Sequence, residues 1–396
     1  MRAAVFLYPW DVIGDPGAPG RIAALGVRQV TLAAAYHSTR ALTPRHPRHR
    51  IVTAGYASVL YPPDPARWSG RRLRPHPAGA WAPGDAFAEA AGALAAAGLD
   101  VHSWVVLAHN SRLGAEHPDT SVVNAYGDRY PWAPCIARTE VRAFLADLAA
   151  EAATRPGAHG TELESCGWYG LAHPHAHDKT AGVELGDAAQ YLMSLCFCSS
   201  CRAGYAEGGT DPDRLARSVR AALDPVWTGT APPGAEIERL LGAEGTAATL
   251  DFRTRTARAF QEETVAAVRA GAPGGFPVLL HADPVAHRCG ANAGVDPAHV
   301  LSVADGVVVP CAGGPDALRP FAERSTRGAR STRGAVIAAN LTVVAGMGGR
   351  PATLEADARR AAELGAGELR LYHAGLASDD DLRLVRTALS RLSGPS

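Results

Sequence analysis

Short apolar runs alternate with alanine-rich segments along most of the chain. A short apolar run between turn residues is typical of a buried strand, and apolar positions repeated every three or four residues indicate a helix. The pattern predicts eight strands: Ala3–Tyr8, Gln29–Ala35, Val101–Ala108, His159–Ser165, Pro277–His281, Gly306–Pro310, Ala335–Asn340 and Glu368–Tyr372. It predicts helices between or after them: Gly20–Leu25, Gly84–Ala97, Glu140–Thr154, Asp296–Val303, Pro315–Arg324, Leu354–Leu364 and Asp379–Leu392.

Alternation of this kind predicts an α/β fold with a parallel sheet covered by helices, and eight strands predict a closed (β/α)8 TIM barrel. An open doubly wound sheet is the alternative. Such a sheet often carries a glycine-rich turn after its first strand, whereas Pro9, Trp10 and Asp11 follow the first strand here. We therefore favour the barrel.

Long insertions follow the predicted strands 2, 3 and 4. A barrel needs about 250 residues, and the surplus of this 396-residue chain lies in Tyr36–Pro83, His109–Thr139 and Cys166–Phe276. All three are βα loops, which belong to the C-terminal face where barrel enzymes hold their active sites. We expect one domain over residues 1–396, with a helical, cysteine-bearing insertion at 196–270.

The charges of the chain balance, with 39 basic and 39 acidic side chains. A neutral chain lacks the basic surface that attracts nucleic acids and anionic membranes. No run approaches the roughly 18 apolar residues of a membrane span, and the first residues lack the pattern of a signal peptide. We expect a cytoplasmic protein with a small-molecule partner. The sequence leaves open whether it forms a homo-oligomer.

Seven cysteines are present, and Cys196, Cys198 and Cys201 form a C-x-C-x2-C knuckle. An odd number of cysteines does not fit a disulfide framework. The knuckle spacing brings three thiolates around one point, which suits a structural, tetrahedral Zn²⁺. We expect Cys135 as the fourth ligand, with Cys166 as the alternate. Buried thiols without a metal are the other interpretation.

The fourth predicted strand carries two acidic residues, Glu162 and Glu164. Strand side chains alternate, so both share a face, and Leu163 on the other face suits packing against the helices. Glu164 then stands at the top of the barrel, where a carboxylate is more often catalytic than structural. Glu162 lies one layer deeper, where a structural role is equally plausible.

Asp283, after the fifth strand, is a candidate second carboxylate because strands 4 and 5 are neighbours. Its alternative role is a loop cap before Pro284. Glu162 is the other candidate partner of Glu164. Two residues of a strand span about 6.5–7 Å, which is close to both the separation in retaining glycosidases (about 5–5.5 Å) and that in inverting ones (about 6.5–9.5 Å), so the stereochemistry stays open.

Polar and aromatic residues in the βα loops and at the strand ends are candidates for substrate binding. Each could also be a loop residue with a local partner. The candidates are His37, Arg40, His109, Asn110, Trp168, Tyr169, His177, Lys179, His281, Asn340 and His373.

These motifs resemble those of clan A glycoside hydrolases, specifically the family 42 β-galactosidases. The segment from Pro134 to Arg142 resembles the family's cysteine-bearing stretch before the third helix, Leu163-Glu164-Ser165 stands where its acid/base Asn-Glu lies, and Cys196, Cys198 and Cys201 match its zinc knuckle. The resemblance covers about residues 130–205. It implies a (β/α)8 barrel, a zinc ion held by four cysteines and Glu164 as the acid/base.

Two departures from the family pattern concern the mechanism. Leu163 replaces the Asn before the acid/base, and Ala335–Asn340 has no carboxylate where the family's nucleophile ends strand seven. We therefore expect a glycoside hydrolase-like protein in which Asp283 or Glu162 partners Glu164. The alternatives are a metal-dependent barrel lyase or isomerase using His281, Asp283, His175 and His177, and a carbohydrate-binding barrel without catalysis.

Overall fold

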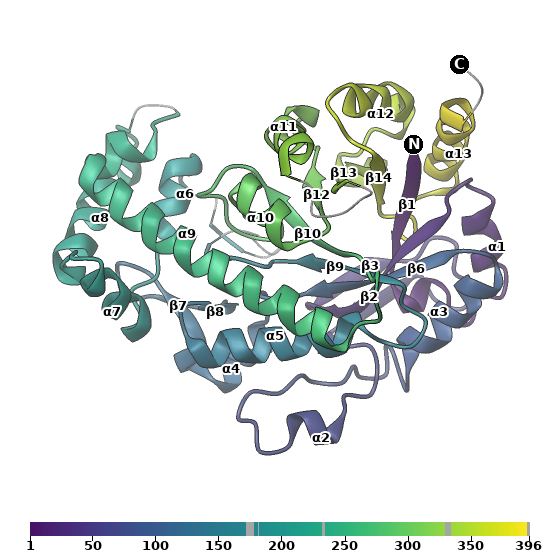
Figure 1. The fold of residues 1–396 in the computed structure, drawn as a ribbon, viewed down its shortest axis with the longest axis horizontal. Helices are drawn as coiled ribbons and strands as arrows, with labels where there is room; N and C mark the ends of the chain where they lie inside the picture. Colours follow the sequence, from purple (N-terminus) through teal and green to yellow (C-terminus); the bar gives the residue numbers. More distant parts are fainter. Residues whose placement is uncertain (172–177, 181, 232–233, 329–333, 394–396) are drawn as a thin grey trace.

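Eight parallel strands form the centre of the molecule in a computed structural model that describes residues 1–171, 178–180, 182–231, 234–328 and 334–393 (Figure 1). Strand β1 pairs with both β2 and β14, so the sheet closes on itself and the predicted (β/α)8 barrel is confirmed. In chain order, the barrel strands are β1 (Arg2–Leu7), β2 (Gln29–Tyr36), β6 (Asp100–Val106), β9 (Gly160–Glu164), β10 (Val278–Asp283), β12 (Gly306–Pro310), β13 (Val336–Thr342) and β14 (Glu368–Tyr372).

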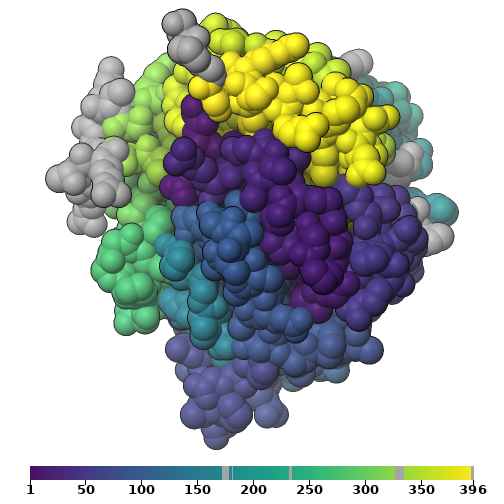
Figure 2. All heavy atoms as spheres, turned by 90° about the vertical axis from the view of Figure 1, so that its right-hand side faces the viewer, coloured from purple at the N-terminus to yellow at the C-terminus, as the bar shows by residue number. Residues whose placement is uncertain are grey.

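The strand ends differ from the predicted ones by no more than two residues. Strand β10 runs on to Asp283 and β13 to Thr342, because their polar residues still pair with neighbouring strands. The first and last strands lie side by side. Figure 2 accordingly shows the start of the chain, in purple, beside its last helix, in yellow.

Helices surround the strands and bury their apolar faces against the outer face of the barrel. Helix α3 illustrates how local sequence sets an element: Asp85 Oδ1 accepts a hydrogen bond of 3.0 Å from the Ala88 N–H at its start, and Gly98 adopts a φ of +79° just after its end. The helices of the βα units, with α9 in the unit of β9, are α1 (Ala18–Ala23), α3 (Ala86–Ala96), α5 (Thr139–Ala153), α9 (Ile237–Gly271), α10 (Pro297–Val303), α11 (Arg319–Gly328), α12 (Leu354–Glu363) and α13 (Asp379–Ser393).

The three predicted insertions carry further elements. A β3–β4 hairpin (Thr39–Leu42, Ile51–Ala54), β5 (Ser58–Val59) and α2 (Pro65–Trp68) follow β2; α4 (Ser111–Glu116), β7 (Ser121–Val123) and β8 (Arg129–Pro134) follow β6. After β9 come α6 (Asp187–Met193), α7 (Ser199–Glu207), α8 (Pro212–Trp227) and α9. Helix α9 is kinked at Gly242, whose φ is +79°, and lies along α5 (Figure 1).

Side chains alternate between two surroundings along the barrel strands. Leu163 belongs to the large core between the strands and the helices, whereas Phe6, Trp104 and Leu279 belong to the clusters inside the barrel. Glu162 and Glu164 lie on the face opposite Leu163, as the strand period requires. None of the described helices combines the length and the hydropathy that a membrane span requires.

Candidate active site and candidate metal centre

Glu164 is the last residue of β9 and lies at the barrel mouth, the name used here for the end of the barrel where the eight strands have their carboxyl ends. Its side chain is 8% exposed, and the indole Nε1 of Trp104 donates a hydrogen bond of 2.8 Å to its Oε2. The next residue, Ser165, has a φ of +57°, which is strained for a residue with a Cβ. The chain thus turns sharply just after Glu164, as is frequent at active sites.

Burial raises the pKa of Glu164, and His281 and the Trp104 hydrogen bond offset only part of this effect. A raised pKa keeps the carboxyl protonated at a higher pH than usual, as a general acid requires. Among the described residues, no second carboxylate contributes to the electrostatic environment of Glu164.

Tyrosines from three other strands lie around this carboxyl group. The Tyr8 hydroxyl donates a hydrogen bond of 3.1 Å to that of Tyr36, whose ring centroid lies 4.6 Å from that of Trp104. Burial raises the pKa of Tyr8, Tyr36 and Tyr372, and the Glu164 carboxylate adds to this at Tyr36 and Tyr372. The three hydroxyls therefore remain protonated and can donate hydrogen bonds.

Sequence reasoning missed Trp104 and these three tyrosines. A signal was present, because Tyr36 and Tyr372 are the last residues of β2 and β14, and Tyr8 directly follows β1. An aromatic residue at the carboxyl end of a barrel strand is placed at the mouth by the fold itself.

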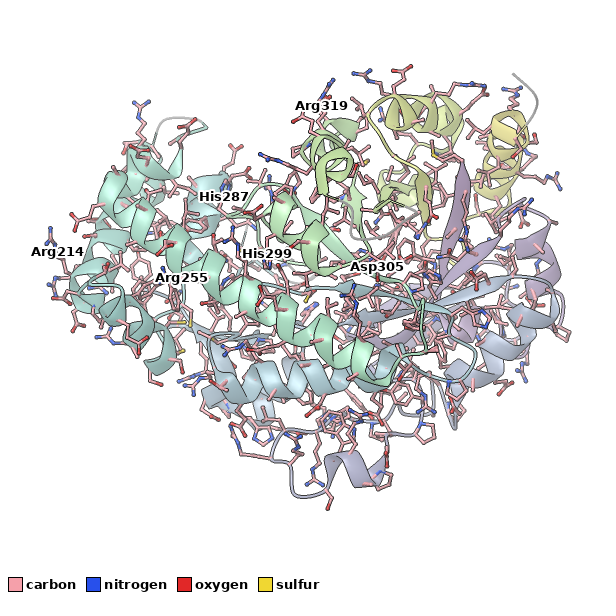
Figure 3. The ribbon with its side chains drawn as sticks, viewed as in Figure 1. Arg214, Arg255, His287, His299, Asp305 and Arg319 are labelled. Atoms are coloured by element: carbon pink, nitrogen blue, oxygen red, sulfur yellow. The ribbon has the colours of Figure 1, made fainter. Side chains whose placement is uncertain are left out.

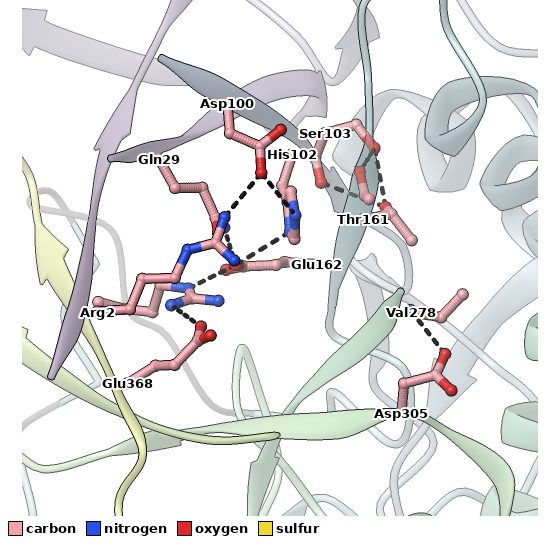
Figure 4. A network of polar contacts seen from close by, with 12 residues as sticks. Arg2, Gln29, Asp100, His102, Ser103, Thr161, Glu162, Val278, Asp305 and Glu368 are labelled. Carbon is pink, nitrogen blue, oxygen red and sulfur yellow. Dashed lines mark hydrogen bonds and ion pairs between the residues drawn. The ribbon is translucent and has the colours of Figure 1, made fainter. Parts of the chain in front are cut away.

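Glu162 lies deeper in the barrel, is fully buried and is paired with Arg370, which is also fully buried. Arg370 Nε donates to Glu162 Oε1 at 2.5 Å, and Arg370 Nη1 lies 2.9 Å from Glu368 Oε2. Gln29 Nε2 is 3.5 Å from Oε1 and His281 Nε2 is 3.6 Å from Oε2. Figure 4 shows the part of this network around Gln29, Glu162 and Glu368, which His102 and Asp100 extend toward Arg2.

Burial alone would raise the pKa of Glu162, but Arg370 and then His281 outweigh burial and lower it to about 2. The carboxylate stays ionised and is held at Oε1 by Arg370 and Gln29, whereas Oε2 has no hydrogen-bond partner among the described residues. This arrangement favours a structural role for Glu162 over that of a second catalytic carboxylate.

Asp283 ends β10, the strand beside β9, and is bound to its own loop. Its Oδ1 accepts a hydrogen bond of 2.8 Å from the Val285 N–H, and its Oδ2 lies 3.4 Å from Arg288 Nε. The first contact is that of a loop cap, the alternative role considered for this residue.

Three of the rim candidates, His37, His109 and Tyr169, form a line of rings with Tyr36 at the mouth. Tyr36 stacks on His37 at 4.2 Å, His37 lies 4.5 Å from His109, and His109 stacks on Tyr169 at 4.2 Å between centroids. Burial, and next the Glu164 charge, raise the pKa of Tyr169. The line starts at Tyr36, at the end of β2, and continues through rings of the second, third and fourth βα loops. Its last ring, Tyr169, is close enough to Glu164 for the charge of that carboxylate to affect its pKa.

His373 and Asn340 offer buried polar atoms without a hydrogen-bond partner among the described residues, namely Nε2 and Oδ1. His373 Nδ1 accepts a hydrogen bond of 3.1 Å from the Gly375 N–H, and its ring stacks on Tyr8 at 4.3 Å. Burial, and next Arg45, lower the pKa of His373 to about 3. The ring is neutral, and its proton lies on Nε2, which can donate to a ligand.

Other rim candidates have structural partners or lie at the surface. Asn110 Oδ1 caps α4 through the Leu113 N–H at 2.9 Å. Trp168 is buried and donates from Nε1 to the Arg253 carbonyl oxygen at 3.0 Å, so its indole packs against α9. Arg40 and Lys179 are exposed.

Part of the candidate histidine-rich loop cannot be placed. His175 and His177 lie outside the described residues. His281 is buried beside Glu162 and the ring of Phe6. In the part of the chain that the structure describes, no group of three or more metal-ligating side chains includes His281 or Asp283.

The four predicted cysteine ligands come together in one buried group. Their sulfur atoms lie within 4.8 Å of one another, with Cys135 Sγ 3.6 Å from Cys198 Sγ and 3.5 Å from Cys201 Sγ. Hydrogen bonds from the neighbouring thiols, Cys135 first, lower the pKa of the Cys198 thiol. The group contains Cys135 and not Cys166, whose own pKa burial raises to about 12. It can bind a metal ion, and four closely spaced sulfur ligands suit a soft cation.

No protein-family model matches the sequence, and neither does any curated protein. Solved structures do match. α-L-Fucosidase isoenzyme 2 from Paenibacillus thiaminolyticus aligns with 13% identity and a TM-score of 0.57 over 99% of this chain and 49% of its own. The PgaB (BpsB) glycoside hydrolase domain from Bordetella bronchiseptica aligns with 15% identity and a TM-score of 0.58 over 98% of this chain and 99% of its own. The GH42 β-galactosidase Gan42B from G. stearothermophilus aligns with 12% identity and a TM-score of 0.54 over 99% of this chain and 56% of its own.

All three of these neighbours are glycoside hydrolases, and one belongs to family 42. The predicted resemblance is therefore confirmed at the level of the fold. The chain spans about half the length of the fucosidase and of the galactosidase, and the whole of the PgaB domain.

Proposed function

We propose that the protein is a glycoside hydrolase that acts on a carbohydrate or glycoside at the barrel mouth, with Glu164 as its general acid/base. The observation that carries this proposal is the environment of Glu164: a carboxyl group at a strand end, buried, with a raised pKa and surrounded by tyrosines. The glycoside hydrolase fold of the structural neighbours supports it.

In this mechanism Glu164 gives its proton to the glycosidic oxygen as the bond to the sugar breaks. Trp104 holds the carboxyl through Oε2 and stabilises the carboxylate formed. The hydroxyls of Tyr36 and Tyr372 and the Nε2–H of His373 are donors for sugar oxygens, Tyr8 holds the Tyr36 hydroxyl, and the aromatic rings suit the apolar faces of the sugar. We propose Asp283 as the second carboxylate, because Arg370 already neutralises Glu162.

Replacement of Glu164 by Gln tests the proposal on a panel of aryl glycosides and oligosaccharides. We expect kcat to fall about 10²- to 10⁴-fold with the fold intact. Asp283→Asn is expected to lower kcat as well, whereas Asn110→Asp, at the cap of α4, serves as a matched rim control with activity retained. Full activity of the Glu164→Gln variant would contradict the proposal.

A second candidate function is carbohydrate binding without hydrolysis. It is favoured by the absence, among the described residues, of a second carboxylate acting on Glu164. Saturable sugar binding measured by calorimetry, together with no turnover by the unmodified protein across the panel, would support this function over the first.

We further propose that the four-cysteine group binds one structural zinc ion. Four thiolates complete its tetrahedral shell and leave no position for a reacting water. Metal analysis of the purified protein is expected to give one zinc per chain, and Cys198→Ser to lose it. We place the protein in the cytoplasm, where free thiols stay reduced; cell fractionation tests this location.

A further inference from the structure

A buried positive charge lies beneath the fourth and fifth βα loops. Arg253, on α9, is 3% exposed and donates from Nη1 to the Ser194 carbonyl oxygen at 3.0 Å. Its Cζ lies 4.9 Å from the ring centroid of Trp168 and 5.1 Å from that of Tyr191. Arg253 forms no ion pair with any described carboxylate. A buried cation without an anion is costly, because aromatic faces and a carbonyl oxygen replace only part of its hydration.

The guanidinium of Arg253 contacts a sulfur atom in place of a carboxylate. Arg253 Nη2 donates to Cys289 Sγ at 3.0 Å. Cys289 is only partly buried and lies in the loop between β10 and β11 (Ala293–Gly294), so reagents can reach it. Burial alone would lower the pKa of Arg253, but Cys289 first and then Tyr191 outweigh burial and raise it.

The guanidinium of Arg253 is the main positive charge near this sulfur, because the other titratable groups around it are neutral or paired elsewhere. His287, labelled in Figure 3, lies 5.8 Å from the ring of Tyr191. Burial, and next Arg288, lower the pKa of His287, so this ring is neutral at neutral pH. Burial raises the pKa of Tyr191 to about 12, so its hydroxyl is neutral too. Arg288 is directed to Asp187 and Asp283.

We propose that Cys289, whose sulfur is held by the buried guanidinium of Arg253, is a site of covalent modification by peroxides and other soft electrophiles. A thiolate is the nucleophilic form of cysteine, and an adjacent arginine favours it. With hydrogen peroxide, the sulfur attacks one peroxide oxygen, an S–O bond forms, the O–O bond breaks and hydroxide leaves. The sulfur is oxidised by two electrons to a sulfenic acid and the peroxide is reduced.

This site is connected to the backbone beside Glu164, which takes the inference beyond the proposed function. The Gly290 N–H donates to the Trp168 carbonyl oxygen at 3.0 Å, and the Ser165 N–H donates to the Ala291 carbonyl oxygen at 2.9 Å. Cys289 is thus two residues from Ala291, whose carbonyl oxygen holds the strained turn after Glu164.

The test measures alkylation of each cysteine by iodoacetamide in the full-length protein, with mass spectrometry as the readout. The reference is Cys289 in the denatured chain at the same pH. We expect Cys289 to react about tenfold faster in the folded protein than in the denatured chain, although it is partly buried. Cys166 and Cys311 are buried, with pKa values raised by burial to about 12, and are expected to react slowly in the folded protein.

Arg253→Met is expected to remove the rate advantage of Cys289. The matched control is Arg255→Met, because Arg255 is exposed on the same helix and pairs with Asp251 (Figure 3). Slow reaction of Cys166 reports that a variant is folded. If the Arg253→Met variant does not fold, the test rests on the wild type alone, through the alkylation rates of Cys289 in the folded protein and in the denatured chain.

Peroxide treatment followed by dimedone labelling is expected to mark Cys289, with loss of the mark in Cys289→Ser. A folded-state rate at or below the denatured rate, an unchanged rate in a folded Arg253→Met variant, or no dimedone mark at Cys289 would overturn the proposal. None of these readouts depends on glycosidase activity.

Discussion

Two carboxylates of one strand illustrate how depth in the barrel decides chemistry. Glu162 and Glu164 lie on the same face of β9, and burial raises the pKa of both as its largest effect. At Glu162 the buried Arg370 reverses the effect and the pKa falls to about 2. At Glu164 only a neutral indole hydrogen bond and His281 oppose it, and the pKa stays raised.

Burial of an acid therefore does not by itself mark a catalytic group. A cationic partner makes the lower carboxylate part of the scaffold, whereas its absence leaves the upper one able to hold and release a proton. Variants that remove one partner at a time separate the two environments.

Removal of Arg370 is expected to have the largest effect on stability. Arg370→Met leaves Glu162 and Glu368 without their cation, and we expect the free energy of unfolding to fall by about 3–5 kcal/mol in urea denaturation. The double variant Glu162→Gln/Arg370→Met should recover much of this loss, because the unpaired charge is gone. A change within about 1 kcal/mol for Arg370→Met would mean that the lower network is not the scaffold described.

The two carboxylates are expected to give stability opposite dependences on pH. The folded pKa of Glu162, about 2, lies below its ordinary value of 4.5. Between these values the unfolded chain binds more protons, so the contribution of Glu162 is present above pH 4.5 and is lost as pH falls toward 2. The folded pKa of Glu164 is raised, so its contribution is present below pH 4.5 and is lost as pH rises through the folded value.

Urea denaturation from about pH 3.5 to 8 checks both signs. The stability advantage of the wild type over Glu162→Gln should shrink as the pH is lowered. The stability of Glu164→Gln relative to the wild type should increase as the pH is raised. If the free energy of unfolding changed with pH in the same way in the wild type and both variants, the two carboxylates would not differ in pKa as described.

Trp104→Phe is expected to have a smaller effect, confined to the mouth. Loss of the indole donor removes an interaction that lowers the pKa of Glu164, so this pKa rises further. The alkaline limb of kcat/KM should move up by less than about one pH unit, and stability should fall by about 1 kcal/mol. Trp132→Phe is the control, since Trp132 donates to the Gly170 carbonyl oxygen instead; an equal shift in both variants would remove the special role of Trp104.

The smallest expected effect concerns the turn above Glu164. Ser165→Gly removes a Cβ from a backbone with a φ of +57° and should raise the free energy of unfolding by less than about 1 kcal/mol. Ser165→Ala keeps the Cβ and should show no such gain. An equal gain in both variants would attribute it to loss of the hydroxyl and not to strain.

Much of the fold and part of the candidate site followed from local patterns. The eight strands and the alternation of Leu163 with its acidic neighbours are set by the sequence period, because a buried face repeats every second residue in a strand. The cysteine group was also predictable, since Cys196, Cys198 and Cys201 lie within six positions of one another. The placement of Glu164 followed from its position at a strand end.

The remaining features depend on contacts between distant residues. Arg370 is 208 positions from Glu162, and Trp104 is 60 from Glu164. Trp168, a candidate for substrate binding, packs against α9, whose position no local pattern reports.

The chain by itself determined which residues face inward along each strand, because side-chain alternation and the apolar period are properties of consecutive residues. Only the closed barrel decided what each inward residue meets, and therefore which acid is ionised and which keeps its proton. The pKa of a buried carboxyl depends on charges a few ångströms away in space, and closure of the barrel brings those charges from strands far apart in the sequence.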